Sequence, residues 1–444
     1  MSIRYCAEKG LLTLNTKNST YQMQIDTHKY LHHLFYGRRV GDTDLSYITP
    51  SYDRGFSGNP YELRYNRAFS LDTMAQEYTS FGVGDFRINS LSVHNGDGSY
   101  GADFRYVDHE IKKGKYSIPG LPSVYDNGGE AETLIINMID PVSHVGIRLY
   151  YGVFEELDVI TRAVEIYNKG QETVKLEKVA SICLDMPFGK WDLVHFHGRH
   201  CMERQMERSP LIHSIQTIAS KRGQTSHHHN PFIILCDHEA SEDHGDCYGL
   251  MFAYSSNHKI EIEVDQLENT RVVMGIHDAQ FLWRLTPGNS FFAPEVIMSF
   301  SHEGFTKLSH NYHDTIRHNV CRGPYKLAER PVLINNWEAT YFDFNKDKLM
   351  EIATQAAELG VEMFVLDDGW FGKRNDDNSG LGDWFVNEEK LQGGLAPLIE
   401  EINALGMKFG LWIEPEMISE DSDLYRAHPD WAYISPNRHP MNWQ

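Results

Sequence analysis

Two adjacent aspartates, Asp367 and Asp368, are the residues of this chain whose types and placement best suit chemistry. They follow an apolar run at 364–366 and precede a glycine and two aromatic residues. Carboxylates at the end of a buried strand are costly unless a polar partner meets them. They accept charge-assisted hydrogen bonds from hydroxyl groups, each worth about 1.5–3 kcal/mol. The pair therefore predicts a site for a polyhydroxylated ligand, although a solvated Asp-Gly turn would have the same sequence.

Aromatic and acidic residues follow the neighbouring predicted strands as well. Trp337, Trp370 and Trp412 each follow or close a strand, where an indole ring could stack on the apolar face of a sugar. Tryptophans also fill cores, and one of the three could do only that. Glu414 and Glu416 alternate at the end of a third strand, and we expect them to support the site rather than to react.

Two other motifs resemble active-site patterns without the context that a site needs. Lys190-Trp191-Asp192 is the kind of tripeptide that places a nucleophilic aspartate at the end of a barrel strand, but it lies in a region of antiparallel strands. The consecutive histidines 227–229 have no carboxylate or cysteine at ligand spacing, and neighbouring side chains rarely converge on one ion. We expect neither a catalytic role for the first nor a metal site at the second.

The chain up to residue 303 reads as strands and turns. The segment 161–184 predicts a hairpin about Asn168-Lys169-Gly170, and 271–301 predicts another with its turn at 287–289. Helical periodicity is rare in this region. A large antiparallel β-sandwich is the simplest fold for it.

Helical spacing first appears at 305–321, where Leu308, Tyr312, Ile316 and Val320 fall on one stripe. We expect a linker helix over 304–330, between an N-terminal β domain at 1–303 and a different architecture after it.

From residue 331 short apolar strands alternate with amphipathic helices, a pattern typical of βα units on a parallel sheet. The predicted strands are 331–337, 361–370 and 407–417, and the predicted helices are 345–360 and 395–406. Polar residues gather at the carboxyl ends of the strands, the edge on which (β/α)₈ barrels build their active sites. Because three strands cannot close a barrel, residues 331–444 predict a partial barrel and a truncated chain.

Composition excludes several partner classes. The 444 residues carry a formal net charge of −21, which argues against nucleic-acid and anionic membrane partners. No apolar run approaches the roughly 18 residues of a membrane span, and no signal peptide is evident. Six scattered cysteines without a C-x-x-C pair favour reduced thiols and a cytoplasmic protein.

Several stretches together resemble the microbial α-galactosidases of glycoside hydrolase family 36. They lie in family order between about residue 50 and residue 440, and their combination is highly specific: YDRGFS, NRAFSLDTMAQEY, SHHHNPF, RPVLINNWEATYFDFN, LDDGWFGKRNDDNSGLGDWFVNEEKL, FGLWIEPEMIS and LYRAHPDWAY. The resemblance implies an N-terminal antiparallel β-supersandwich, then the first three strands of a (β/α)₈ barrel. It also implies retaining hydrolysis of terminal α-D-galactose from galactosides such as melibiose and raffinose, without a cofactor, in full-length proteins that are often homotetramers.

The resemblance assigns roles to the residues singled out above. It implies that Asp367 and Asp368 hold the galactose hydroxyls at positions 4 and 6, that Trp412 lines the same subsite and that Trp337 lies near it. The axial 4-hydroxyl distinguishes galactose from glucose, so the aspartates would recognise the sugar without cleaving it.

Three residues before residue 303 are implied as well. Asp53 and Arg67 match family residues that reach toward the active site of a neighbouring subunit. His200 stands where relatives usually carry a tryptophan, on the side of the site that faces the leaving group, so leaving-group preference can differ.

The catalytic pair of the family has no counterpart here. Its nucleophile lies in a Lys-Trp-Asp-x-Asn-Arg motif and its acid/base aspartate further on, and neither occurs in these 444 residues. We expect both beyond Gln444, which would make this chain an inactive fragment. Three alternatives stay open: an α-N-acetylgalactosaminidase or galactosyl-transferring relative, a non-catalytic carbohydrate-binding protein, and a subunit completed by a separately encoded chain.

Overall fold

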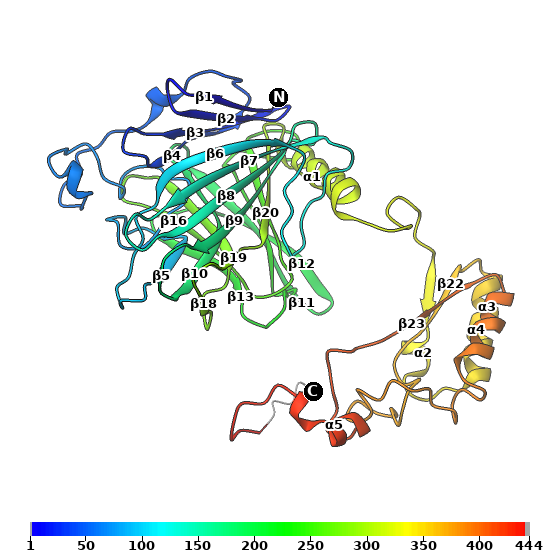
Figure 1. The fold of residues 1–444 in the computed structure, drawn as a ribbon. Helices are drawn as coiled ribbons and strands as arrows, with labels where there is room; N and C mark the ends of the chain where they lie inside the picture. Colours follow the sequence, from blue (N-terminus) through cyan, green and yellow to red (C-terminus); the bar gives the residue numbers. More distant parts are fainter. Residues whose placement is uncertain (1, 440–444) are drawn as a thin grey trace. The chain divides into compact units, whose positions relative to one another are not determined.

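The computed structural model describes residues 2–439 and divides the chain into two compact units (Figure 1). The first unit spans Met1–Lys326 and the second begins at Leu327. The first is built almost entirely of antiparallel strands, and the second contains parallel strands and helices.

Three antiparallel sheets make up the first unit. The N-terminal sheet has the order β1 (Ile3–Cys6), β2 (Leu11–Asn15), β3 (Ser19–Ile25), β4 (Leu31–Arg38). The second sheet has the order β13 (Ile215–Ser220), β16 (His258–Val264), β17 (Thr270–Ile276), β10 (Val174–Met186), β18 (Trp283–Leu285), with β5 (Leu91–His94) also on β10. The third has the order β12 (Met202–Pro210), β11 (Trp191–Arg199), β14 (His229–Asp237), β15 (Cys247–Ala253), β20 (Glu295–Ser301), β9 (Val159–Asn168), β8 (Val145–Phe154), β7 (Ala131–Ile139), β6 (Arg105–Lys113), with β19 (Ser290–Phe292) also on β9.

The main core of this unit lies between the second and third sheets, as in a β-sandwich. It joins Val164 and Ile166 of β9 to Ile182 and Leu184 of β10. Strand β9 is buried at every position, because its other face is covered too. The antiparallel sandwich predicted for this region is what the structure contains.

The two predicted hairpins are wrong in their pairing. Strand β9 pairs with β8, β20 and β19, whereas β10 pairs with β17, β5 and β18, so the turn at Asn168 links the two sheets. The turn at 287–289 also crosses between sheets, because β18 pairs with β10 and β19 with β9. A turn signal fixes where the chain reverses but not which strand it then pairs with.

Helix α1 (Gly304–Thr315) packs on the third sheet and so belongs to the first unit. Leu308 and Tyr312 are buried there, and the Tyr312 hydroxyl donates to the Ile297 carbonyl (3.0 Å). The helix then widens into a π-helical turn, η3 (Ile316–Val320). Because the π-helical turn is wider, the buried face of the helix moves by one residue. Asn319 is buried, whereas Val320, which was predicted to lie on the buried face, is exposed.

The second unit contains a three-stranded parallel sheet in the order β21, β22, β23. Its elements are β21 (Leu333–Asn335), α2 (Trp337–Thr340), α3 (Lys346–Glu358), β22 (Met363–Leu366), α4 (Leu395–Ala404), β23 (Lys408–Leu411), α5 (Asp423–Ala427) and η4 (Pro429–Trp431). Helices α3 and α4 lie side by side against the sheet (Figure 1). The short helices of the first unit are η1 (Ser46–Ile48) and η2 (Tyr61–Leu63).

Local sequence explains these elements. The Asn345 side chain caps α3 by accepting from the Lys348 amide (3.0 Å), and α3 and α4 bury Leu349 and Leu398 against the sheet residue Phe364. The predicted order of three strands and two helices is confirmed, but each strand is shorter than predicted, and Trp337 lies in α2 rather than in a strand. Within the described residues, no helix has the length and apolar character needed to cross a membrane.

Candidate galactose-recognition site

Asp367 is the first residue after β22, at the carboxyl end of the parallel sheet. One carboxylate oxygen accepts from the Asn335 side-chain amide at the end of β21 (2.7 Å), and the other accepts from the Asp368 backbone amide (2.8 Å). The Asn336 side chain accepts from the Asp367 amide (2.9 Å). Asp367 is half-buried, and because an ionised carboxylate has about four acceptor positions, it can still accept a ligand hydroxyl.

Asp368 is buried, with 6% of its surface exposed, and forms an ion pair with Arg374. The Arg374 Nε lies 3.1 Å from both carboxylate oxygens, and one terminal nitrogen donates to Oδ2 (2.8 Å). The other terminal nitrogen donates to the Ser379 carbonyl (3.0 Å). Neither aspartate is a solvated loop acid: both carboxylates are held in place by the protein.

The two tryptophans predicted for the site lie at the ends of the flanking strands. Trp337 begins α2 directly after β21, and its amide donates to the Asn335 side chain (3.1 Å). Trp412 follows β23, and its amide donates to the Leu366 carbonyl (2.9 Å). Both side chains are half-buried, as a sugar-stacking face requires. The structure thus brings Asp367, Asp368, Trp337 and Trp412 to one edge of one sheet.

Trp370 differs from these two tryptophans. It is 4% exposed, packs on Phe371 and donates from its indole nitrogen to the Trp412 carbonyl (2.9 Å). Trp370 is the tryptophan of the three that fills the core.

Glu414 and Glu416 follow β23 near the same edge. Burial, together with the charge of Glu416 and then of Asp368, raises the pKa of Glu414, and Arg374 opposes this shift.

Asp53 and Arg67 form an exposed ion pair in the first unit, with about 60% of each side chain accessible to solvent. The guanidinium donates to both carboxylate oxygens, through Nε at 2.8 Å and through a terminal nitrogen. Hydrogen bonds from Arg67 and from the Gly55 amide lower the pKa of Asp53 to about 2. The structure brings this pair together within its own unit.

His200 lies in the turn between β11 and β12 and is exposed. Asp192 of the Lys-Trp-Asp tripeptide lies near the amino end of the antiparallel strand β11, not at the carboxyl end of a parallel strand. It is buried in β11, where it accepts from Arg208 (2.7 Å) and bonds the His238 ring (2.5 Å). His227 and His228 stack on each other, and no group of three or more potential ligands among the described residues is arranged to hold a metal.

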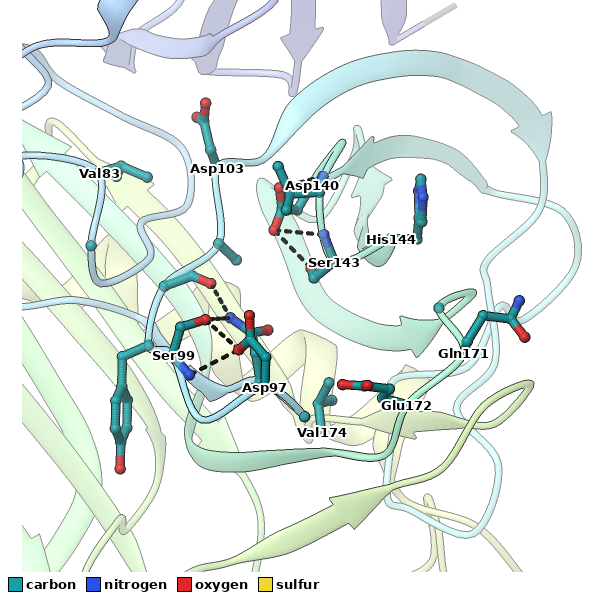
Figure 2. A pocket seen from close by; sticks show the side chains of 18 residues that line it. Val83, Asp97, Ser99, Asp103, Asp140, Ser143, His144, Gln171, Glu172 and Val174 are labelled. Carbon is teal, nitrogen blue, oxygen red and sulfur yellow. Dashed lines mark hydrogen bonds between the residues drawn. The ribbon is translucent and has the colours of Figure 1, made fainter.

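The first unit also contains a cavity of about 580 Å³, shown in Figure 2. Its carboxylates are used in local turns: Asp97 accepts from Ser99 (2.6 Å from the hydroxyl) and Asp140 from Ser143 (2.7 Å from the hydroxyl). Asp103, another lining residue, is paired with Arg105 (2.6 Å).

Sequence reasoning missed several residues around the aspartates. Asn335 and Arg374 bond their carboxylates, and Asn336 accepts from the Asp367 amide. Lys390 donates to the carbonyls of Gly369 and Arg374. Asn335 could have been found, since it ends a strand adjacent to that of Asp367. Arg374 and Lys390 lie in a long connection between β22 and α4, where no periodic pattern shows which backbone they contact.

The chain is similar to known proteins over nearly its whole length. Residues 29–286 match the model of the glycosyl hydrolase family 36 N-terminal domain, and residues 290–443 match that of melibiase. A bifunctional α-galactosidase/sucrose kinase of Mediterraneibacter gnavus is 49% identical over 99% of this chain and 47% of its own length. Its galactosidase domain has a solved structure with a TM-score of 0.97, covering 99% of this chain and 61% of that one.

A second relative is α-galactosidase AgaA of Geobacillus stearothermophilus, 45% identical over 99% of this chain and 60% of its own length. A solved AgaA variant in complex with raffinose has a TM-score of 0.95, at 45% identity over 97% of this chain and 60% of that one. The chain thus spans roughly half to three fifths of the length of these relatives. Because one family model alone covers more than half of its residues, the chain belongs to glycoside hydrolase family 36.

Proposed function

We propose that this chain carries the galactose-recognising part of an α-galactosidase. The reaction is retaining hydrolysis of terminal α-D-galactose from galactosides such as melibiose and raffinose. One observation carries the proposal: Asp367 and Asp368 are neighbours at a strand end, where protein hydrogen bonds fix both carboxylates, Asp367 being half-buried and Asp368 buried. The solved AgaA variant that contains raffinose supports this substrate class.

Recognition follows from hydrogen-bond chemistry. A carboxylate that loses a sugar hydroxyl is left unpaired in a half-buried site, and such sites reject the analogue without the hydroxyl more strongly than shape alone can. We assign Asp367 and Asp368 to the 4- and 6-hydroxyls of galactose, with Trp412 lining the subsite and Trp337 near it.

The parallel sheet of the second unit is, in our proposal, the first part of a (β/α)₈ barrel. Strand and helix alternate in sequence order, β21, β22 and β23 are neighbours in that order, and this region matches the melibiase model. Site residues at the carboxyl ends of the strands fit the edge that barrels use.

Retaining glycosidases use two carboxylates, a nucleophile and an acid/base. The Lys-Trp-Asp-x-Asn-Arg motif of the nucleophile does not occur in these 444 residues. We therefore expect this chain by itself to bind α-galactosides without hydrolysing them.

We also propose that Asp53 and Arg67 complete the site of a neighbouring subunit in a homo-oligomer. The pair is exposed, as a group that meets another subunit must be in the isolated chain. Exposed aromatic side chains on the same segment, Phe56 and Tyr61 among them, would be buried by such a contact. Light scattering of the parent and of Asp53→Ala measures the oligomeric state, and calorimetry measures galactose affinity. An oligomer in both proteins with weaker galactose binding in Asp53→Ala supports this arrangement, and a monomeric parent contradicts it.

The central test is calorimetry with galactose and glucose. We expect saturable binding of galactose and at least tenfold weaker binding of glucose, which presents its 4-hydroxyl in the other orientation. Asp367→Asn removes a charged acceptor and should weaken galactose binding by roughly 10- to 100-fold, from the value of a charge-assisted hydrogen bond.

Asp377→Asn is the matched control, because Asp377 is exposed on the loop that follows Arg374. Its galactose affinity should equal that of the parent chain. Equal binding of galactose and glucose, or full binding by Asp367→Asn, contradicts the proposal, and so does turnover of p-nitrophenyl α-galactoside by the 444-residue chain.

A further inference from the structure

We propose that Lys390 is a positioning residue for sugar recognition. Its ammonium holds three backbone carbonyls at once and so fixes the turn that begins with Asp367 and Asp368 and ends at Arg374. This inference rests on the function proposed above. Lys390 is 22 residues beyond Asp368 along the chain, and it is not one of the residues to which the family resemblance gives a role.

The contacts of Lys390 use every donor that it has. Its ammonium donates to the carbonyls of Phe342 (3.0 Å), Gly369 (2.9 Å) and Arg374 (3.1 Å). A lysine ammonium carries three N–H groups, so the side chain is saturated without a carboxylate partner. It therefore joins the segment after α2 to both ends of the turn that begins with the aspartates.

Each end of that turn bears directly on the site. Gly369 follows Asp368 immediately and has a φ of +96°, a backbone conformation that side chains disfavour. A Cβ at Gly369 would come within 3.0 Å of the Phe342 ring. The turn is thus tightly packed, and the Gly369 carbonyl can point at Lys390 only while this shape is kept.

Arg374 transmits the constraint to Asp368. Its carbonyl is held by Lys390, and its guanidinium holds both oxygens of Asp368. A shift of the Arg374 backbone would therefore move the guanidinium that orients the Asp368 carboxylate. Positioning within about 0.5 Å distinguishes a competent site from a loose one.

The chemistry of lysine suits this place. Three carbonyl oxygens directed at one point repel one another unless a cation lies between them. The Lys390 Nζ also lies over the Phe344 ring, 4.8 Å from its centroid. Burial lowers the pKa of Lys390, opposed by the charges of Asp368 and Asp343. The ammonium is thus kept near the aspartates at a desolvation cost that an ordinary surface lysine does not bear.

The test compares Lys390→Met with Lys390→Arg and with a matched control, Lys348→Met. Lys348 is in the same unit but exposed, and it bonds only Asp343, through its carbonyl (3.1 Å) and carboxylate (3.0 Å). Galactose affinity is measured by calorimetry, and amide hydrogen exchange is measured on peptides covering 364–376 and 346–358.

Lys390→Met should bind galactose at least tenfold more weakly and exchange faster at 364–376, with exchange of α3 at 346–358 unchanged. Lys390→Arg keeps the charge but presents a planar fork, so its affinity should fall between those of the parent and Lys390→Met. Lys348→Met should stay within twofold of the parent. A general loss of stability would produce neither a partial recovery of galactose affinity in Lys390→Arg nor an increase in exchange confined to 364–376.

Several outcomes overturn the proposal. They are galactose affinity within twofold of the parent in Lys390→Met, unchanged exchange at 364–376, or an equal effect of Lys348→Met. If Lys390→Met does not fold, Lys390→Arg is compared with the parent under the same criteria. If the parent chain binds no galactose, the proposed function fails instead, and exchange at 364–376 alone decides whether Lys390 holds the turn.

Discussion

Buried aspartate–arginine pairs occur in both units, but in different places within their sheets. In the first unit, Arg271 of β17 donates to both oxygens of Asp185 (2.6 and 2.7 Å) and to Asp85 (2.8 Å). Asp185 and Arg271 are directly opposite each other on paired strands. In the second unit, Asp368 and Arg374 lie beyond the end of β22, beside the half-buried Asp367.

This difference separates a structural carboxylate from one that can bind. Asp185 and Asp85 are enclosed within the sandwich, and each charge is matched by a buried arginine. At the strand end of the second unit, the half-buried Asp367 keeps acceptor positions for a ligand, on the sheet edge that also carries the half-buried Trp337 and Trp412. The degree to which a carboxylate is enclosed, rather than its residue type, decides which aspartates are available to a ligand.

The largest effect should come from removing Arg271. Arg271→Met leaves the buried Asp185 without its arginine, whereas Asp85 keeps Arg87, and the variant should lose about 3–5 kcal/mol of unfolding free energy. Urea denaturation followed by circular dichroism measures it. Arg317→Met, which removes an exposed partner of Asp314, should cost less than about 1 kcal/mol. Equal losses in the two variants would erase the distinction between enclosed and exposed pairs.

Removing Arg374 tests whether the strand-end pair differs in function. Arg374→Met should cost about 3 kcal/mol, since it leaves Asp368 buried and unpaired, and it should also weaken galactose binding. Denaturation and calorimetry on the same preparation measure both. A stability loss with unchanged galactose affinity would make this pair as purely structural as that of Arg271.

The free energy of unfolding should depend on pH, in part through His258 in β16 of the first unit. This side chain is fully buried, and burial lowers its pKa to about 4, against about 6.5 in an unfolded chain. Between these values the unfolded state binds more protons, so stability falls as the pH is lowered from 6.5 to 4, by up to about 3 kcal/mol.

His258→Leu removes this contribution. The free energy of unfolding of parent and variant, measured by urea denaturation across that range, should diverge in favour of the variant as the pH falls. Parallel curves for the two proteins would show that His258 does not resist protonation.

The N-cap of α3 in the second unit should have a smaller effect, on stability alone. Asn345→Ala removes the cap of α3, which should cost about 1 kcal/mol because the Lys348 amide loses its acceptor. Galactose affinity should not change, since α3 contributes packing rather than ligand contacts. Calorimetry and urea denaturation check both expectations, and a loss of affinity as large as that of Asp367→Asn would contradict them.

Much of the second unit could be predicted from the sequence. Period and capping residues identified α3, α4 and the three strands, and the parallel order followed from their alternation. The aspartate pair was found because acids after an apolar run are conspicuous. Arg374 and Lys390 were not, because their contacts depend on how a long connection folds back over the turn.

The first unit was predictable as a class but not in its topology. Alternating apolar residues identified β9 and β10, yet their partners lie far away in sequence, and local patterns carry no information about them. The π-helical turn at Ile316–Val320 was missed for a related reason: Asn319 and Tyr125 hold each other through reciprocal hydrogen bonds that only the fold provides.

A crystal structure of this chain with melibiose tests the central claim most directly. The account predicts the galactosyl ring at the carboxyl ends of β21, β22 and β23, with its 4- and 6-hydroxyls within about 3.2 Å of the carboxylates of Asp367 and Asp368. A sugar bound elsewhere, with both carboxylates contacting only Asn335 and Arg374, would contradict it.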